Sequence, residues 1–259
     1  MLRHAESQRF PSEQRPRRLA LLTDFGAGPY VGQMRLLLAG ARPSVQVVDL
    51  ISDLVPFRPD LAAYLLPGLL RGMPNHTLYL CVVDPGVGSD RDVLAARVGN
   101  NWLLAPDNGL LVPLLRSRSE AVELWRVRWR PSDMSASFHG RDLFVPIAQR
   151  LLSGRLPAAE PLSSDHAVGA DMPASCQAVC YVDHFGNAIT GVPASVLSSA
   201  TRLRIKDVRI ARARTFSDVP QGEPFWYKNA FGLVEIAVNQ GRADAQLGLV
   251  PGDPLTFEP

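Results

Sequence analysis

The stretch TLYLCVVDPGVGSDR, residues 77–91, decides the fold of this chain. It opens with an apolar run from Leu78 to Val83, and an unbroken run of this kind is typical of a strand covered on both faces in a parallel sheet. The strand ends at Asp84-Pro85-Gly86, because proline cannot donate to a sheet ladder. A carboxylate thus follows a buried strand, and a glycine-containing turn separates it from Arg91. In open α/β sheets ligands bind at this end of the strands, although an ordinary turn with a solvated Asp84 is an equal alternative.

The segments around this stretch alternate between strand and helix patterns. Strands are expected at 19–23, 45–50 and 77–84, and helices at 31–41 and 59–73, with Pro67 kinking or breaking the second helix. This order predicts parallel βαβ units. A hairpin at 93–98 and 102–105, a strand at 122–127 and a helix at 143–152 follow.

The second half of the chain shows short strand patterns in place of alternating strands and helices. Short strand patterns are expected at 177–182, 202–205, 208–211, 225–227, 234–238 and 254–257, which suggests a small barrel or sandwich. The predicted fold is therefore an α/β N-terminal domain with a mainly parallel sheet, plus a C-terminal all-β barrel-like domain. The expected boundaries are a flexible basic tail at 1–18, the α/β domain at 19–155, a linker at 156–176 and the β-barrel domain at 177–259.

Composition narrows the classes of protein. Hydrophobic residues at 46% and charged residues at 20% are ordinary for a soluble globular protein, and a net charge of +2 does not indicate nucleic acid as a partner. No segment approaches the roughly 20 apolar residues that span a bilayer. The three cysteines, Cys81, Cys176 and Cys180, lack the paired Cys/His clusters of a zinc site, so no metal is expected and a reducing compartment fits. Since residues 1–18 also lack the apolar core of a secretory signal, a cytoplasmic location is expected.

Acidic residues end three of the predicted strands. These are Asp24, Asp49 and Asp84. Several acids along one edge of a parallel sheet suggest a polar site, where a carboxylate can accept hydrogen bonds from both hydroxyls of a ribose. The chain has neither GxGxxG nor GxxxxGK[ST], which favours a nucleoside over a nucleotide with a pyrophosphate.

His139 lies just before Gly140 and a predicted helix start. The positive end of a helix disfavours imidazolium, so a neutral histidine that can accept a proton is expected, and a purely structural histidine is the alternative. No GxSxG nucleophile elbow is present, which argues against a Ser-His-Asp hydrolase.

A polar cluster ends the first strand pattern of the second domain, at Asp183 to Asn187. It is either a common surface turn or a place where Asn187 reads a base edge and Asp183 meets an ammonium group. The aromatic residues near Phe216 and at Phe225-Trp226-Tyr227 belong either to the core or to a stacking surface for a base.

Seven motifs together resemble a known family. They are TDFG (23–26), YVGQM (30–34), VVDPGVG (82–88) with Arg91, PDNGLL (106–111), FHGRD (138–142), DHFGN (183–187) and GLVEIAVNQGRA (232–243). In this order, across residues 19–259, they are similar to the S-adenosylmethionine (SAM) hydrolases, or SAM hydroxide adenosyltransferases, which are relatives of fluorinase and chlorinase. The resemblance implies a homotrimer with interfacial active sites that converts SAM and water into adenosine and L-methionine, with no cofactor.

The resemblance also implies roles for individual residues. Asp84, Arg91 and His139 would hold the attacking water: Asp84 orients the group, Arg91 stabilises hydroxide character and His139 takes the proton. Asp24 would bind the ribose, and Asn187 would recognise adenine with Phe216 stacking on it. Glu235 and the main chain near Val238 would line the nucleoside pocket. Asp183 would contact the methionine ammonium group.

The chain departs from the family pattern at the methionine end. Ala230 stands where the family often has serine, Gly28-Pro29 lacks the family's aspartate, and a common histidine is absent after Asp49. Two other functions stay open. A SAM-dependent halogenase would carry an extra loop before PDNG and a tyrosine in place of His139, and neither is present. A nucleoside-binding protein without turnover would not need Asp84, Arg91 and His139 together.

Overall fold

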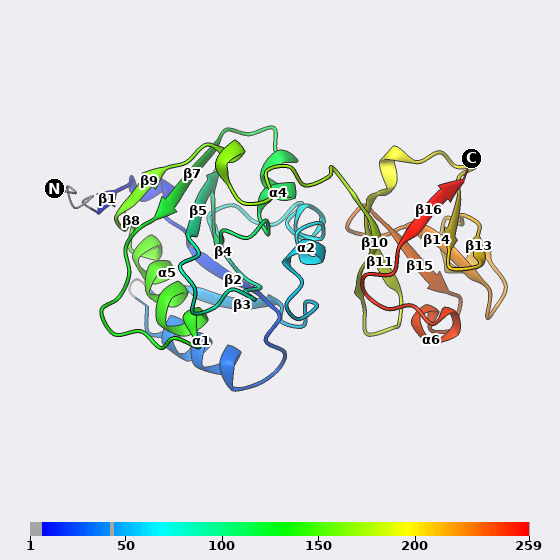
Figure 1. The fold of residues 1–259 in the computed structure, drawn as a ribbon, viewed down its shortest axis with the longest axis horizontal. Helices are drawn as coiled ribbons and strands as arrows, with labels where there is room; N and C mark the ends of the chain where they lie inside the picture. The colour runs from blue at the N-terminus through cyan, green and yellow to red at the C-terminus, as the bar shows by residue number, and fades with distance from the viewer. Residues whose placement is uncertain (1–6, 42–43, 259) are drawn as a thin grey trace. The chain divides into compact units, whose positions relative to one another are not determined.

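The structure is a computed structural model that describes residues 7–41 and 44–258. Its contacts divide the chain into two compact units (Figure 1). The first unit contains the chain up to Pro59 together with Met73–Met172, and the second contains Asp60–Gly72 together with the chain from Pro173 onward. The second unit therefore takes a segment of the N-terminal half that the sequence assigns to the α/β domain.

A seven-stranded sheet forms the centre of the first unit, in the order β3-β2-β4-β6-β5-β7-β9. The strands are β2 (Arg18–Thr23), β3 (Gln46–Ile51), β4 (Thr77–Val82), β5 (Val93–Val98), β6 (Asn101–Pro106), β7 (Val122–Val127) and β9 (Ala159–Pro161). The pairs β3–β2, β2–β4 and β4–β6 are parallel, and the pairs along β6–β5–β7–β9 are antiparallel. Only β5 and β9 run against the others, so the sheet is mixed but mostly parallel.

Apolar side chains cover both faces of β4, as its sequence predicts. Leu78 and Leu80 belong to a core cluster that also takes residues from α1 (Pro29–Ala39) and α5 (Val145–Leu152). Their neighbours Tyr79 and Cys81 point to the opposite face and are also buried. This double coverage makes β4 a fixed support for the residues that follow it.

Two parts of the first unit differ from the sequence expectation. Residues 1–6 of the expected tail lie outside the described residues, but β1 (Gln8–Arg9) pairs with β8 (Arg155–Leu156). Phe10 stacks on Trp102 with 4.7 Å between ring centroids. The expected linker contributes β8 and the edge strand β9. Apolar and backbone contacts thus hold both segments on the unit, although their polar, proline-containing sequences indicate loops.

The expected helix at 59–73 is broken, as predicted, and the break lies at residues 63–65, just before Pro67. It forms two short helices, α2 (Pro59–Ala62) and α3 (Leu66–Leu69), because proline lies in the first turn of α3 and cannot continue a preceding helix. The hydroxyl of Tyr64 between them donates to the carbonyl oxygen of Pro173 at 2.9 Å. This bond ties the segment to the second unit.

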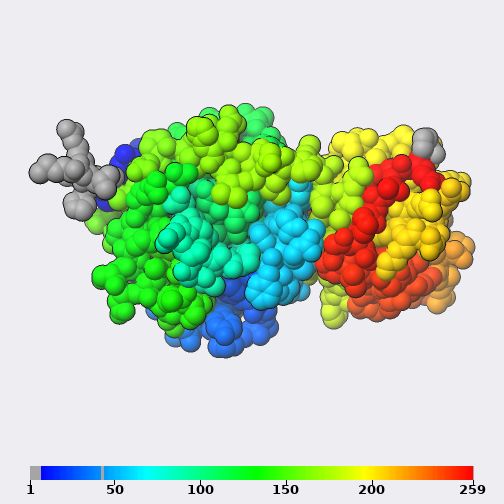
Figure 2. Space-filling model, viewed as in Figure 1, coloured from blue at the N-terminus to red at the C-terminus, as the bar shows by residue number. Residues whose placement is uncertain are grey.

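The second unit contains two antiparallel sheets. One has the order β10-β11-β15-β14, with β10 (Cys176–Val182), β11 (Ala188–Pro193), β15 (Leu233–Val238) and β14 (Pro224–Lys228). The other pairs β13 (Val208–Ile210), β12 (Arg202–Ile205) and β16 (Leu255–Glu258). Figure 2 shows the C-terminal strand in red beside the yellow residues near 205, as the β12–β16 pairing requires. Within the described residues the two sheets do not close into one hydrogen-bonded barrel, so the expected barrel is not confirmed.

Short helices complete the described chain. They are η1 (Ser12–Gln14), α4 (Val112–Arg116), the π-helical turn η2 (Gly140–Phe144), η3 (Ser164–His166), η4 (Ala194–Val196), η5 (Phe216–Asp218) and α6 (Ala243–Leu247). Across residues 7–41 and 44–258, no helix has both the length and the apolar character needed to cross a membrane.

Candidate active site

Arg91 and Asp84 form a two-pronged ion pair at the end of β4. Arg91 donates from Nε to Asp84 Oδ1 at 2.5 Å, and from Nη2 to Asp84 Oδ2. The two side chains are only 10% and 5% exposed. A bidentate pair fixes the plane of the carboxylate as well as its position, so the burial makes this a rigid, charged anchor.

The turn between the two residues is built for this contact. Gly88 has φ of +84°, and a Cβ atom there would lie 2.8 Å from the carbonyl oxygen of Ala136. Only glycine adopts this backbone without strain in so close a space. The glycine turn thus returns Arg91 to Asp84.

His139 joins the pair from another element. It lies just before η2, and its Nδ1 is 3.3 Å from Nη2 of Arg91. A guanidinium has no acceptor, so Nδ1 must accept and the proton of a neutral ring resides on Nε2. Burial, and then the positive charge of Arg91, hold the pKa of His139 below its usual range. The predicted neutral state is supported, but its main cause is burial and not a helix end.

A cavity of about 350 Å³ lies against these residues at the carboxyl ends of β2 and β4. It is lined by Asp24, Asp84 and His139, and by apolar and aromatic residues that include Phe25, Phe57 and Phe138. Asp24 follows β2 directly, and β2 pairs with β4 in parallel, so the two carboxylates meet at one edge of the sheet. Asp49 does not join them, because it lies within β3 and pairs with Arg35 at 3.2 Å.

Asp24 is held by a loop that the sequence did not single out. Its Oδ2 accepts a hydrogen bond from the backbone N–H of Phe57 at 3.0 Å. Phe57 has φ of 63° and an exposed ring that lines the cavity. Burial, with a smaller effect of the Asp84 charge, raises the pKa of Asp24. An exposed phenylalanine after a proline has no pattern that distinguishes it from an ordinary loop residue.

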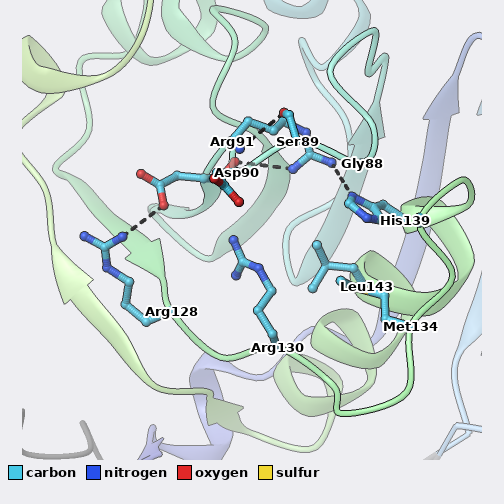
Figure 3. Close-up of a pocket in the computed structure, with 11 residues that line it drawn as sticks. Gly88, Ser89, Asp90, Arg91, Arg128, Arg130, Met134, His139 and Leu143 are labelled. Atoms are coloured by element: carbon cyan, nitrogen blue, oxygen red, sulfur yellow. Dashed lines mark hydrogen bonds and ion pairs between the residues drawn. The ribbon is translucent and has the colours of Figure 1, made fainter.

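A second cavity, of about 490 Å³, also reaches His139 (Figure 3). Its lining differs in character, with Arg91, Arg128 and Arg130 among the residues of the turn after β4 and of the segment after β7. His139 therefore lines both cavities, and Arg91 lines the second.

In the second unit, Asp183 and Asn187 form one hydrogen-bonded turn. Asp183 Oδ1 accepts from the backbone N–H groups of Phe185 and Asn187, at 2.9 and 2.8 Å. Its Oδ2 accepts from the side-chain amide of Asn187 at 3.0 Å. The amide is thereby oriented with its carbonyl oxygen away from Asp183, which suits a group that presents an acceptor to a ligand.

Glu235 is a carboxylate buried on β15, 4% exposed. It accepts hydrogen bonds from the hydroxyl of Tyr227 at 2.6 Å and from the side-chain amide of Asn229 at 2.8 Å. Burial raises the pKa of Glu235. The sequence names Tyr227 only as an aromatic residue and does not link it or Asn229 to Glu235. The available signal was that Tyr227 pairs with Glu235 when β14 and β15 form a hairpin.

The remaining predicted residues also lie in the second unit. The ring of Phe216 in η5 packs edge-on against Phe225 and Tyr227, with centroids 5.1 and 5.4 Å apart. Val238 ends β15 and is buried. The candidate residues thus form two groups: Asp24, Asp84, Arg91 and His139 in the first unit, and Asp183, Asn187, Phe216, Glu235 and Val238 in the second. No group of three or more metal-ligating side chains occurs within the described parts of the chain.

The fold and the site define a two-part protein. An α/β unit carries a buried Asp–Arg–His group beside a cavity with two carboxylates, and a mainly antiparallel β unit follows it. Comparison with protein families makes this specific. The SAM hydroxide adenosyltransferase N-terminal domain matches residues 19–160 and the C-terminal domain of the same name matches residues 177–256. The chain therefore belongs to the SAM hydroxide adenosyltransferase family.

Individual relatives agree with this placement. A protein of Salinispora tropica named (R)-S-adenosyl-L-methionine hydrolase is 36% identical, covering 92% of this chain and 96% of the relative. A protein of the same name from Thermus thermophilus is also 36% identical, covering 90% and 96%. A fluorinase of an Actinoplanes species is 24% identical, covering 85% and 90%. A crystal structure of an uncharacterized conserved protein from Thermotoga maritima superposes with a TM-score of 0.80 at 30% identity, over 93% of this chain and all of that one.

Proposed function

We propose that the protein hydrolyses S-adenosyl-L-methionine to adenosine and L-methionine by attack of water at C5′. The observation that carries this proposal is the buried Asp84–Arg91–His139 group beside the cavity that contains Asp24. Two relatives that are 36% identical over nearly the whole chain bear the name of this activity.

The chemistry needs a positioned nucleophile more than an acid. The sulfonium leaves as a neutral thioether, so no group has to protonate it. An aligned water close to C5′ is what the site must supply, and alignment alone lowers a barrier by up to about 7–11 kcal/mol in well-oriented systems. Arg91, fixed by Asp84, favours the developing hydroxide character of that water.

His139 acts as a hydrogen-bond donor in this scheme. Because Nδ1 accepts from Arg91, the ring offers its Nε2–H to the nucleophile and holds its oxygen in place. A proton on Nδ1 would break this contact and set two cations side by side, so His139 is a poor resting place for the proton of water. This refines the sequence hypothesis, in which His139 takes that proton. The proton is released to solvent. SAM and water are thus converted into adenosine, methionine and one proton, which balances the reaction.

The other residues bind the substrate. Asp24 accepts hydrogen bonds from the ribose hydroxyls, as a carboxylate fixed by one backbone N–H still has free acceptor sites. Asn187 reads adenine, Phe216 stacks on it, Glu235 and the main chain near Val238 line the nucleoside pocket, and Asp183 meets the methionine ammonium group. The two groups of residues act together in a homotrimer, with the first unit of one subunit facing the second unit of its neighbour.

A halogenase is the alternative function that two observations address. β5 begins at Val93, two residues after Arg91, and the β5–β6 hairpin reaches Pro106 without an insertion. The fluorinase relative is also more distant than the hydrolases, at 24% against 36% identity. Both observations favour water over a halide as the nucleophile.

Incubation with SAM in halide-free buffer, followed by chromatography, tests the proposal. We expect adenosine and methionine in equal amounts, with the epimer that is R at sulfur consumed in preference to the S epimer. Absence of adenosine, or formation of 5′-chloroadenosine once chloride is added, contradicts the proposal. A nucleoside-binding protein without turnover would bind adenosine but leave SAM intact.

A further inference from the structure

Most of the arginines beside the second cavity are paired with carboxylates. Arg91 is matched by Asp84, and Arg128 is matched by Asp92 and Glu160 through contacts of 3.0 Å each. Asp92 is shared with Arg126, at 2.9 Å. The arginines that approach this cavity therefore have their charges neutralised by neighbouring carboxylates, with one exception.

The exception is Arg130. Its Nη1 donates to the backbone carbonyl oxygens of Val127 and Trp129, at 2.8 and 3.1 Å, and within the described residues it forms no ion pair with a carboxylate. Figure 3 shows its guanidinium directed from the lower segment toward the turn that carries Asp90 and Arg91. Burial lowers the pKa of Arg130, and the positive charges of Arg91 and Arg128 act in the same direction, whereas the charge of Asp92 opposes them.

The rest of the wall bounds the size of the ligand and its contacts. The turn from Gly88 to Arg91 forms another side of the cavity, where the Ser89 hydroxyl donates to the carbonyl oxygen of Gly86 at 2.7 Å, and the volume of about 490 Å³ exceeds that of a single inorganic ion. Asp90 is the one acidic side chain of the wall that has no ion pair among the described residues, and it is exposed at the surface. Two backbone carbonyls accept from Nη1 of Arg130, so the N–H groups on its Nε and Nη2 stay available for a bidentate contact.

We propose that this cavity binds an oxyanion, with Arg130 as its principal ligand, and that the bound anion slows turnover by acting on His139. The chemistry fits either free phosphate or the phosphate group of a small monoester. A negative charge next to the ring favours imidazolium, and imidazolium cannot accept from Arg91. Because the anion does not enter the cavity that contains Asp24, we expect it to lower kcat and leave KM for SAM unchanged. This second part rests on the proposed function.

Binding is tested without turnover, by calorimetric titration of inorganic phosphate and of ribose 5-phosphate at constant ionic strength. We expect saturable binding to the wild type, binding at least about tenfold weaker to Arg130→Gln, as loss of a charge-assisted contact implies, and unchanged binding to Arg35→Gln. Arg35 is the matched control, since it is an exposed arginine already paired with Asp49. Tighter binding of ribose 5-phosphate identifies a monoester as the ligand, and equal or weaker binding identifies free phosphate.

Two results overturn the site: no saturable binding of either probe to the wild type, or equal binding to Arg130→Gln and the wild type. The kinetic part is tested separately, by measuring adenosine formation at increasing phosphate. A fall in kcat at constant KM in the wild type, absent in Arg130→Gln, supports the coupling to His139. Binding with unchanged kcat, or a rise in KM alone, contradicts it. Failure of the proposed hydrolysis would leave the calorimetric result intact, so the two failures are distinguishable.

Discussion

Nη2 of Arg91 lies 3.3 Å from Nδ1 of His139, and the same guanidinium nitrogen is bonded to Asp84. One arginine therefore fixes both the carboxylate and the tautomer of the histidine. The contact places the ring proton on Nε2, which supports the proposal that His139 holds the nucleophile instead of deprotonating it.

Substitution of His139 separates these two roles. Glutamine at 139 can accept from Arg91 through Oε1 and donate through Nε2, whereas alanine can do neither. We expect His139→Ala to lower kcat by about 100-fold or more. We expect kcat of His139→Gln to be at least about tenfold higher than that of His139→Ala. Steady-state rates of adenosine formation measure both. Equal inactivity of the two variants would instead indicate that the histidine is a base.

Asp24→Asn tests the ribose contact. The amide lacks the negative charge that strengthens hydrogen bonds from the two ribose hydroxyls. Hydrogen bonds to a charged group contribute about 1.5–3 kcal/mol to binding, so the variant should bind SAM more weakly. We expect KM for SAM to rise roughly 10- to 100-fold with a smaller effect on kcat. Asp49→Asn is the control, because Asp49 lies on β3, is paired with Arg35 and does not line the cavity. A normal KM in Asp24→Asn, or an equal rise in Asp49→Asn, would remove Asp24 from the binding site.

Gly88→Ala tests the turn that carries Arg91. Both Gly88 and Gly222 have positive φ, but a Cβ atom meets the Ala136 carbonyl oxygen at Gly88 and open space at Gly222. Gly222→Ala should lose about 1 kcal/mol of unfolding free energy from backbone strain, and Gly88→Ala about 1–3 kcal/mol together with a fall in kcat. Urea denaturation and the adenosine assay measure these effects. Full activity of Gly88→Ala would show that the turn does not position Arg91.

The buried Glu235 predicts a pH-dependent effect on stability. Burial raises its pKa above the ordinary value of 4.5, so above pH 4.5 the folded state binds more protons than the unfolded state. The contribution of Glu235 to the unfolding free energy therefore falls as the pH rises through this window. Glu235→Gln removes the titration, so its unfolding free energy relative to the wild type should increase from pH 4.5 to pH 8. A difference that is independent of pH would contradict a raised pKa.

Much of the first unit follows from its sequence because local pattern and tertiary role agree there. The run from Leu78 to Val83 is apolar on both faces, and the structure buries both faces. The proximity of Arg91 to Asp84 was expected from the resemblance, and the short glycine-containing turn between them allows it. The contact of His139 with Arg91 was expected only by resemblance, since 48 residues separate them and no local pattern links them.

The second unit was harder to predict. β11 (Ala188–Pro193) was missed because Gly191 and Pro193 weaken its strand pattern. Gly191 is explained only by tertiary packing, as a Cβ atom there would lie 2.6 Å from Cβ of Cys176 and 2.9 Å from Cβ of Tyr64. The hydrogen bonds of Glu235 to Tyr227 and Asn229 likewise depend on strand register, which single residues do not reveal.

The proposed attack of water at C5′ of SAM is best tested by following labelled oxygen into the products. The enzyme is incubated with SAM in H₂¹⁸O without halide, and the adenosine formed is analysed by mass spectrometry. Attack by water predicts one ¹⁸O atom in adenosine, at the 5′-hydroxyl, and none in methionine. Adenosine without the label, or no adenosine at all, would contradict it.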